Sequence, residues 1–235
     1  MKIYLTLNLN TLKYQTYQSS NLKTKKMSSQ SILVPCDISK IRSEAIKDGK
    51  LQVMPFDFYK RFTPNEIKYF MHQEAIYVLP TSELIDWLKD NIKGNAIEIG
   101  AGNGAISRAL GIPITDSRMQ ELKEISLVYL LSGQPIIKYA NDVEKLSADE
   151  AVIKYKPDTV IGAFITHKFN GVNGNALGVD LKSLIDNVSK YIHIGNLTTH
   201  KDYGIYNRLT NQHYFDWLIT RSVNQKENRI FVWGK

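Results

Sequence analysis

The sequence predicts an α/β fold with a mostly parallel seven-stranded sheet and helices on both faces. Three observations lead to this prediction. Strand-like and helix-like runs alternate from residue 95 onward, a glycine-rich turn follows the first run, and no linker divides the region. Alternating strands and helices are typical of βαβ units, whose strands pair in parallel. The expected strands are 95–99, 112–115, 135–140, 158–165, 190–195, 217–223 and 229–233, and the expected helices are 103–110, 118–132, 147–155 and 180–189.

The last two expected strands depart from this parallel pattern. They are joined by the short polar stretch Asn224-Gln225-Lys226-Glu227-Asn228. A polar connection of this length between two strand-like runs is typical of an antiparallel hairpin. We therefore expect an antiparallel C-terminal hairpin at one edge of the sheet.

Before the sheet, residues 31–94 are predicted to form a helical segment packed on a main domain of residues 95–235. Thr63-Pro64-Asn65-Glu66 has the pattern of a helix start, with a threonine cap, proline at the first position and glutamate at the third. Thr81-Ser82-Glu83 predicts a second start, and Gly94 is a plausible end for the helix that follows.

Residues 1–30 are predicted to be a disordered basic extension. Residues 1–26 hold five lysines and no acid, so they supply five of the seven net positive charges of the chain. A basic balance can indicate nucleic-acid binding, but here the charge belongs mostly to a polar tail. Nucleic acid is therefore a possible partner that the sequence does not favour.

Composition also limits the classes of protein to which the chain can belong. With 235 residues, 43% of them hydrophobic, the chain can bury a sizeable core. The single Cys36 excludes an intramolecular disulfide and fits a reducing compartment. No apolar run reaches 18 residues, so we expect no membrane span and a cytoplasmic location.

The most informative stretch is Glu98-Ile99-Gly100-Ala101-Gly102-Asn103-Gly104, between a strand-like run and a helix-like run. Glycine lacks a Cβ and tolerates positive φ, so such a turn lets the backbone approach a ligand closely. The N–H groups at the start of the following helix point toward the same place. In an open α/β sheet this position is the usual ligand crevice.

This stretch resembles the class I S-adenosylmethionine-dependent methyltransferases, over about residues 75–235. That family has an acidic residue, one further residue and a Gly-x-Gly-x-Gly turn after its first strand. Asp116 follows the second expected strand, 18 residues after Glu98, and Asn141-Asp142-Val143 follows the third. The resemblance implies a Rossmann-like methyltransferase with S-adenosylmethionine as cofactor.

The resemblance also implies roles for individual residues. Glu98 would bind the methionine amino group, Asp116 the ribose hydroxyls, and Asp142 with Val143 the adenine. A carboxylate suits the ribose because charged acceptors form stronger hydrogen bonds. The cofactor-binding residues implied are Glu98, Gly100, Ala101, Gly102, Asn103, Gly104, Asp116, Ser117, Asp142 and Val143.

Two alternatives stay open. Gly100-x-Gly102-x-x-Ala105 also satisfies the relaxed glycine fingerprint of nicotinamide or flavin dinucleotide folds. Against that class, Glu98 at the strand tip would repel a pyrophosphate. The other alternative is a non-catalytic binding or interaction protein with the same fold.

The methyl acceptor, a small molecule or a macromolecule, is not identified by the sequence. No Asn/Asp-Pro-Pro-Tyr/Phe signature and no Pro-Cys follow the fourth expected strand. The acid cluster of metal-dependent members is missing there as well, so no metal is implied. These departures motivate the non-catalytic alternative.

Substrate-side candidates follow the fourth and fifth expected strands. Thr166 and His167 begin a loop rich in glycine and asparagine, which can serve as a lid, and His200 and Tyr203 lie at the same edge. His167 is a candidate general base, because an imidazole titrates near neutral pH. A structural or exposed histidine is the commoner case. Tyr77, before the sheet, can cover the cofactor or pack in the core.

Overall fold

The computed structural model describes residues 33–168, 177–201 and 204–234. The expected N-terminal extension and Tyr203 lie outside these residues. No described helix has the length and apolar character that crossing a membrane requires.

The central sheet has five strands in the order β3-β6-β7-β9-β8. β3, β6 and β7 pair in parallel, whereas β9 pairs antiparallel with β7 and with β8. The expectation of a mostly parallel seven-stranded sheet is therefore wrong, because this sheet is five-stranded and mixed. The bounds are β3 Ala96–Ile99, β6 Thr159–Ala163, β7 Lys190–Asn196, β8 Asn211–His213 and β9 Asn228–Gly234.

Two very short strands continue the arrangement beyond β3. β4 (Thr115–Asp116) pairs in parallel with β5 (Glu144–Lys145), and the two form a separate sheet. A parallel bridge between Glu98 and Ile114 joins this pair to β3, with the Ala101 N–H donating to the Thr115 carbonyl at 3.0 Å. The strands thus lie in the line β5, β4, β3, β6, β7, β9, β8.

The expected strand 135–140 does not form. The N–H of Ile137 donates to the side-chain oxygen Oε1 of Gln120 at 2.9 Å instead of to a strand backbone. The pairing with β4 is made a few residues later, by β5. The Gln120 side chain has therefore replaced the backbone hydrogen bonds to a neighbouring strand that the apolar pattern led us to expect.

The antiparallel edge is present, but its outer strand is β8 rather than 217–223. A buried side-chain network occupies the region around residue 220. Asn228 donates to the Leu218 carbonyl at 2.8 Å and accepts from Thr220 and Asn196 at 2.8 and 3.0 Å. Gln225 accepts from the Thr220 N–H at 3.1 Å. These bonds hold the chain in turns, so it cannot lie extended beside β9.

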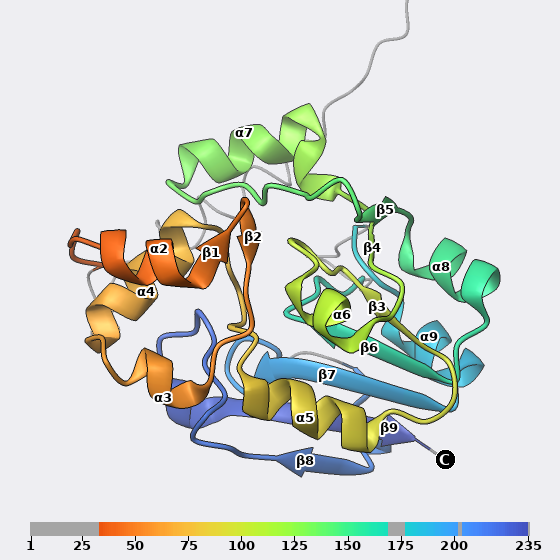
Figure 1. Cartoon of the computed structure of the whole chain (residues 1–235). Helices are drawn as coiled ribbons and strands as arrows, with labels where there is room; N and C mark the ends of the chain where they lie inside the picture. The colour runs from red at the N-terminus through yellow and green to blue at the C-terminus, as the bar shows by residue number, and fades with distance from the viewer. Residues whose placement is uncertain (1–32, 169–176, 202–203, 235) are drawn as a thin grey trace, which may run out of the picture.

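Helices cover both faces of the sheet (Figure 1). α5 and α6 pack on one face against β6, β7 and β9, and α8 and α9 contribute to the apolar cluster on the other. The bounds are α5 Ser82–Asn91, α6 Ala105–Leu110, α8 Ala148–Tyr155 and α9 Leu181–Asn187. The expected helix 118–132 is split into a 3₁₀ turn, Met119–Glu121, and α7, Lys123–Leu131.

The N-terminal helices form a third apolar cluster, which reaches Ala105 at the start of α6. They are α2 Ser39–Ala45, α3 Phe56–Tyr59 and α4 Pro64–Gln73, with the hairpin β1 Ile46–Lys47 and β2 Lys50–Leu51. The capping box predicted at Thr63 and Glu66 is formed, and Thr81 caps α5 by accepting from the Leu84 N–H. The connection after α4 carries Ala75, Tyr77 and Val78 to the cavity described below.

We predict that Asn228→Ala lowers the free energy of unfolding by about 3 kcal/mol, because it leaves several buried polar partners without a hydrogen bond. Chemical denaturation measures this change. Asn211→Ala, at an exposed position of β8, is the matched control and should change stability by less than about 0.5 kcal/mol. Equal effects from the two variants would show that the Asn228 network does not stabilise this edge.

Candidate functional site

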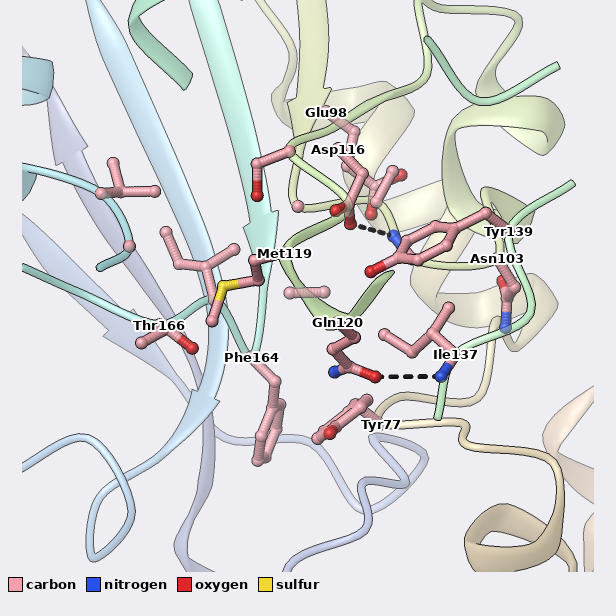
Figure 2. Close-up of a pocket in the computed structure, with 18 of the residues that line it drawn as sticks. Tyr77, Glu98, Asn103, Asp116, Met119, Gln120, Ile137, Tyr139, Phe164 and Thr166 are labelled. Atoms are coloured by element: carbon pink, nitrogen blue, oxygen red, sulfur yellow. Dashed lines mark hydrogen bonds between the residues drawn. The ribbon is translucent and has the colours of Figure 1, made fainter. Parts of the chain in front are cut away.

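A cavity of about 420 Å³ lies at the carboxyl ends of β3 and β6. The chain leaves β3 toward β4 on one side and later returns to β6 on the other, so the strand order reverses here. Such a reversal is where open α/β sheets bind ligands. Its position therefore marks the cavity as the candidate site (Figure 2).

The glycine turn forms one wall. Gly100 and Gly102 have φ values of 59° and 58°, a region that side chains with a Cβ rarely adopt. At Gly100 an added Cβ would also lie 2.8 Å from Cγ2 of Ile165. Conformation and space together require glycine at Gly100, and the turn exposes its backbone to the cavity.

Glu98 is 1% exposed and lines the cavity. Its Oε2 accepts from the N–H of Ser107 at 3.0 Å and from the Ser107 hydroxyl. Burial raises the pKa of Glu98 to about 7, and the nearby Asp116 carboxylate adds to this rise while the Ser107 hydrogen bonds oppose it. No described residue donates a hydrogen bond to Oε1, which leaves this oxygen for a ligand.

Asp116 ends β4 and is 6% exposed. Its Oδ2 accepts from the N–H of Gly102 at 2.9 Å, and its Oδ1 accepts from the N–H of Arg118 at 2.7 Å. Burial raises its pKa, although these two bonds and a hydrogen bond with the Tyr139 side chain favour the charged form. Asp116 therefore shapes the turn as well as lining the cavity, and its carboxylate can still accept from a further donor.

The opposite wall is held together by Gln120. Its side chain donates to the hydroxyl of Tyr129 at 3.1 Å and accepts from the N–H of Ile137 at 2.9 Å. The bonds join the 3₁₀ turn, α7 and the segment that was expected to be a strand. The wall residues that sequence reasoning missed include Met119, Gln120, Leu122, Tyr129, Ile137, Tyr139, Leu146, Ser147, Phe164, Ile165 and Val179.

Backbone strain gathers around the cavity. Ala75 and Phe164 line it with φ values of 52°, and Arg118 beside it has a φ of 53°. These are three of the five described non-glycine residues with positive φ. Such conformations cost of order 1–3 kcal/mol each and cluster at functional sites. The strain is thus a second indication that the cavity is functional.

The structure brings together most of the residues expected to bind the cofactor, but not all. Those that line the cavity are Glu98, Gly100, Ala101, Gly102, Asn103, Asp116 and Ser117, joined by Thr166 from the substrate-side set. Gly104, Val143, His167 and His200 do not line it.

Asp142 is also absent from the wall. Its carboxylate receives two bonds of 2.9 Å from the guanidinium of Arg108, and Lys50 lies 3.5 Å away. The Arg108 hydrogen bonds hold the pKa of Asp142 at about 2. Asp142 is therefore committed to a pair outside the cavity, and the adenine role implied by the resemblance lacks a matching position in this structure.

His200 is 4% exposed and lies behind Phe164. The centres of the two rings are 4.8 Å apart. It accepts from the N–H of Asn196 at 2.9 Å, and burial lowers its pKa to about 4. It therefore supports Phe164 from behind rather than facing the cavity. Among the described residues, no group of three or more metal-ligating side chains is placed to hold an ion.

No family model matches the chain, and no curated protein does. Solved structures with a similar fold include WbdD, 11% identical with a TM-score of 0.38 over 65% of this chain, which spans 40% of WbdD. The 23S rRNA methyltransferase ErmE is 15% identical, with a TM-score of 0.32. The match covers 66% of this chain and 68% of the ErmE chain. Magnesium protoporphyrin IX methyltransferase (ChlM) from Synechocystis PCC 6803, with bound SAM, is 12% identical, with a TM-score of 0.34. The match covers 85% of this chain and 97% of the ChlM chain.

ErmE is a 23S rRNA methyltransferase and ChlM is a magnesium protoporphyrin IX methyltransferase. Similarity at this level carries no argument about activity, cofactor or substrate. Those questions depend on the geometry of the cavity.

We predict that Glu98 makes stability depend on pH. The folded protein binds the Glu98 proton more tightly than the unfolded chain, so this contribution is complete below pH 4.5 and is lost as pH rises through about 7. The difference between these two pKa values corresponds to about 3 kcal/mol. The unfolding free energy of the wild type, relative to Glu98→Gln, should fall by up to that amount between pH 4.5 and 8. A constant difference across this range would contradict the raised pKa.

Proposed function

We propose that the protein is a methyltransferase that binds S-adenosylmethionine in this cavity. The observation that carries the proposal is the convergence of Glu98 and Asp116 on the glycine turn at the reversal point of the sheet. Two buried carboxylates with few compensating charges favour a ligand that brings positive charge and hydroxyl donors. A sulfonium compound with an amino group and a ribose meets both needs.

The described lining contains no lysine, arginine or histidine. A dinucleotide would place its pyrophosphate near two buried carboxylates with no cation in the wall to offset the repulsion. The chemistry of the wall therefore favours the adenosyl cofactor over the dinucleotide. A volume of about 420 Å³ also falls within the range of ligand sites.

The residues at hand suit distinct parts of this ligand. Oε1 of Glu98 can accept from the amino group, and the remaining lone pairs of Asp116 can accept from the ribose hydroxyls. Gly100 and Gly102 let the ligand lie against the backbone. When bound, the cofactor supplies an electrophilic methyl group on a positively charged sulfur. Aromatic faces attract such a charge, and Tyr77, Tyr129 and Phe164 stand in the wall.

The protein's own contribution to transfer is then alignment and exclusion of water. Met119, Ile137 and Ile165 provide apolar walls, and Gln120 fixes the side that carries Tyr129. Holding two reactants in line can supply a large part of the barrier reduction. Because His167 and His200 do not line the cavity, we assign no general base. The acceptor is proposed to bind at the end near Tyr77 and Phe164, away from Glu98 and Asp116 (Figure 2).

The first test is calorimetric titration with S-adenosylmethionine, S-adenosylhomocysteine and NAD. We predict micromolar binding of the adenosyl ligands and none of NAD. Asp116→Asn should weaken adenosyl binding by about 1–3 kcal/mol, or five- to 150-fold, because it removes a charged acceptor. Asp142→Asn is the matched control outside the cavity and should change affinity less than twofold. A larger loss from Asp142→Asn would restore that residue to the cofactor site.

The affinity itself should depend on pH. A cationic ligand binds the ionised form of Glu98 better, so affinity should rise roughly tenfold from pH 6 to pH 8 for a pKa of about 7. Binding should release a proton, which calorimetry in buffers of different ionisation enthalpy detects. Glu98→Gln should remove both effects. Absence of adenosyl binding to folded protein would overturn the cofactor assignment, and binding without transfer to any acceptor would favour the non-catalytic alternative.

A further inference from the structure

A guanidinium with no carboxylate partner among the described residues lies beside the acceptor end of the cavity. Arg221 has its guanidinium carbon 3.9 Å from the ring centre of Tyr77, which lines the cavity. No described carboxylate lies within salt-bridge distance of Arg221. Its Nη1 is buried and has no hydrogen-bond acceptor among the described residues. Buried polar groups normally have a partner, so this nitrogen requires an explanation.

The backbone fixes the position of Arg221. Its N–H donates to the Tyr77 carbonyl at 2.9 Å, and the preceding residue, Thr220, forms a bridge with Val78. Thr220 is also held by the buried network around Asn228. The charge is therefore presented on a rigid support, which is what recognition of a ligand group requires.

Among the described residues, the surroundings of Arg221 contain no compensating anion. Burial, and after it the positive charge of Arg221, lowers the pKa of His72 at the end of α4. Tyr129 of α7, another cavity residue, also lies within the electrostatic reach of Arg221. The groups around it are thus a neutral imidazole and two phenols. The cavity has two carboxylates at one end and an uncompensated cation beside the other.

We propose that Arg221 binds an anionic group, a carboxylate or a phosphate, on the methyl acceptor. This inference rests on the proposed function, since it takes the Glu98 end for the cofactor. Guanidinium groups bind carboxylate and phosphate through two parallel hydrogen bonds. The neighbouring rings of Tyr77, Tyr129 and Phe164 suit an aromatic or apolar body attached to that anion. The acceptor class is therefore an aromatic or apolar acid.

Ligand-observed NMR with three small probes tests this assignment on the full chain, with and without saturating S-adenosylhomocysteine. Benzoate carries a carboxylate, phenyl phosphate carries a phosphate, and benzamide is the neutral analogue of benzoate. We expect benzoate or phenyl phosphate to bind at least tenfold more tightly than benzamide, and the better of the two identifies the anion. Equal affinity for all three probes, or no binding of either anion, would overturn the proposal.

Variants assign the effect to Arg221. Arg221→Met should abolish the preference for the anion, and Arg221→Lys should retain part of it because the charge remains. Arg208→Met removes an exposed arginine that pairs with Asp186, and it should leave the preference unchanged. Thermal unfolding of each variant checks that it is folded. If Arg221→Met fails to fold, the test depends on Arg221→Lys. A bidentate site would be contradicted if this variant kept the full preference for the anion and showed an unchanged benzoate NMR contact pattern.

Calorimetry with S-adenosylhomocysteine on the same samples separates this inference from the proposed function. Unchanged affinity in Arg221→Met is the expected result. A tenfold loss would show that Arg221 binds the carboxylate of the cofactor, and the acceptor assignment would then be wrong. A protein that binds benzoate through Arg221 but no adenosyl ligand would have lost the proposed function while keeping the anion site.

Discussion

The cavity depends on the hydrogen bond between the Asp116 carboxylate and the N–H of Gly102. It ties the end of β4 to the glycine turn after β3, although the strands share only one bridge and a few hydrogen bonds. The second oxygen of Asp116 holds Arg118 in a left-handed conformation, and Arg118 in turn donates to the Val143 carbonyl. One buried carboxylate thus positions the turn, the following loop and the start of β5. Its burial raises the energy of the charged form, which a positively charged ligand would lower.

The short helix α6 and the short strand β4 explain why an irregular segment, rather than a strand, forms one wall of the cavity. α6 has six residues and β4 has two, so little sheet exists beyond β3. The chain that follows α7 therefore lies across the opening, where Ile137 and Tyr139 reach the cavity. Gln120 supplies the hydrogen bond that a neighbouring strand would have made. Arg108 at the end of α6 meanwhile takes Asp142 away from the ligand side.

Local signals in the sequence predicted what local forces determine. The glycine turn, the threonine caps and the strands β3, β6, β7 and β9 follow from periodicity, capping chemistry and positive φ. The run 217–223 has the apolar pattern of a strand but does not form one, because Thr220 is hydrogen-bonded to Gln225 and Asn228. Asn196 completes this network from 32 residues away in the sequence. The pairing of Arg108 with Asp142 likewise spans 34 residues and has no local signature. Gln120 and Tyr129 join the site only after folding.

The distribution of charge suggests how one cavity can serve two ligands. Glu98 and Asp116 are acidic and buried at the end formed by the turn, whereas Arg221 lies beside Tyr77 at the other end. Because the dielectric response inside a protein is weak, each end disfavours the charge that the other attracts. A positively charged cofactor and an anionic acceptor would then each have one preferred end and one orientation. Phe164, with its strained backbone directly after β6, lines the cavity at the acceptor end together with Tyr77.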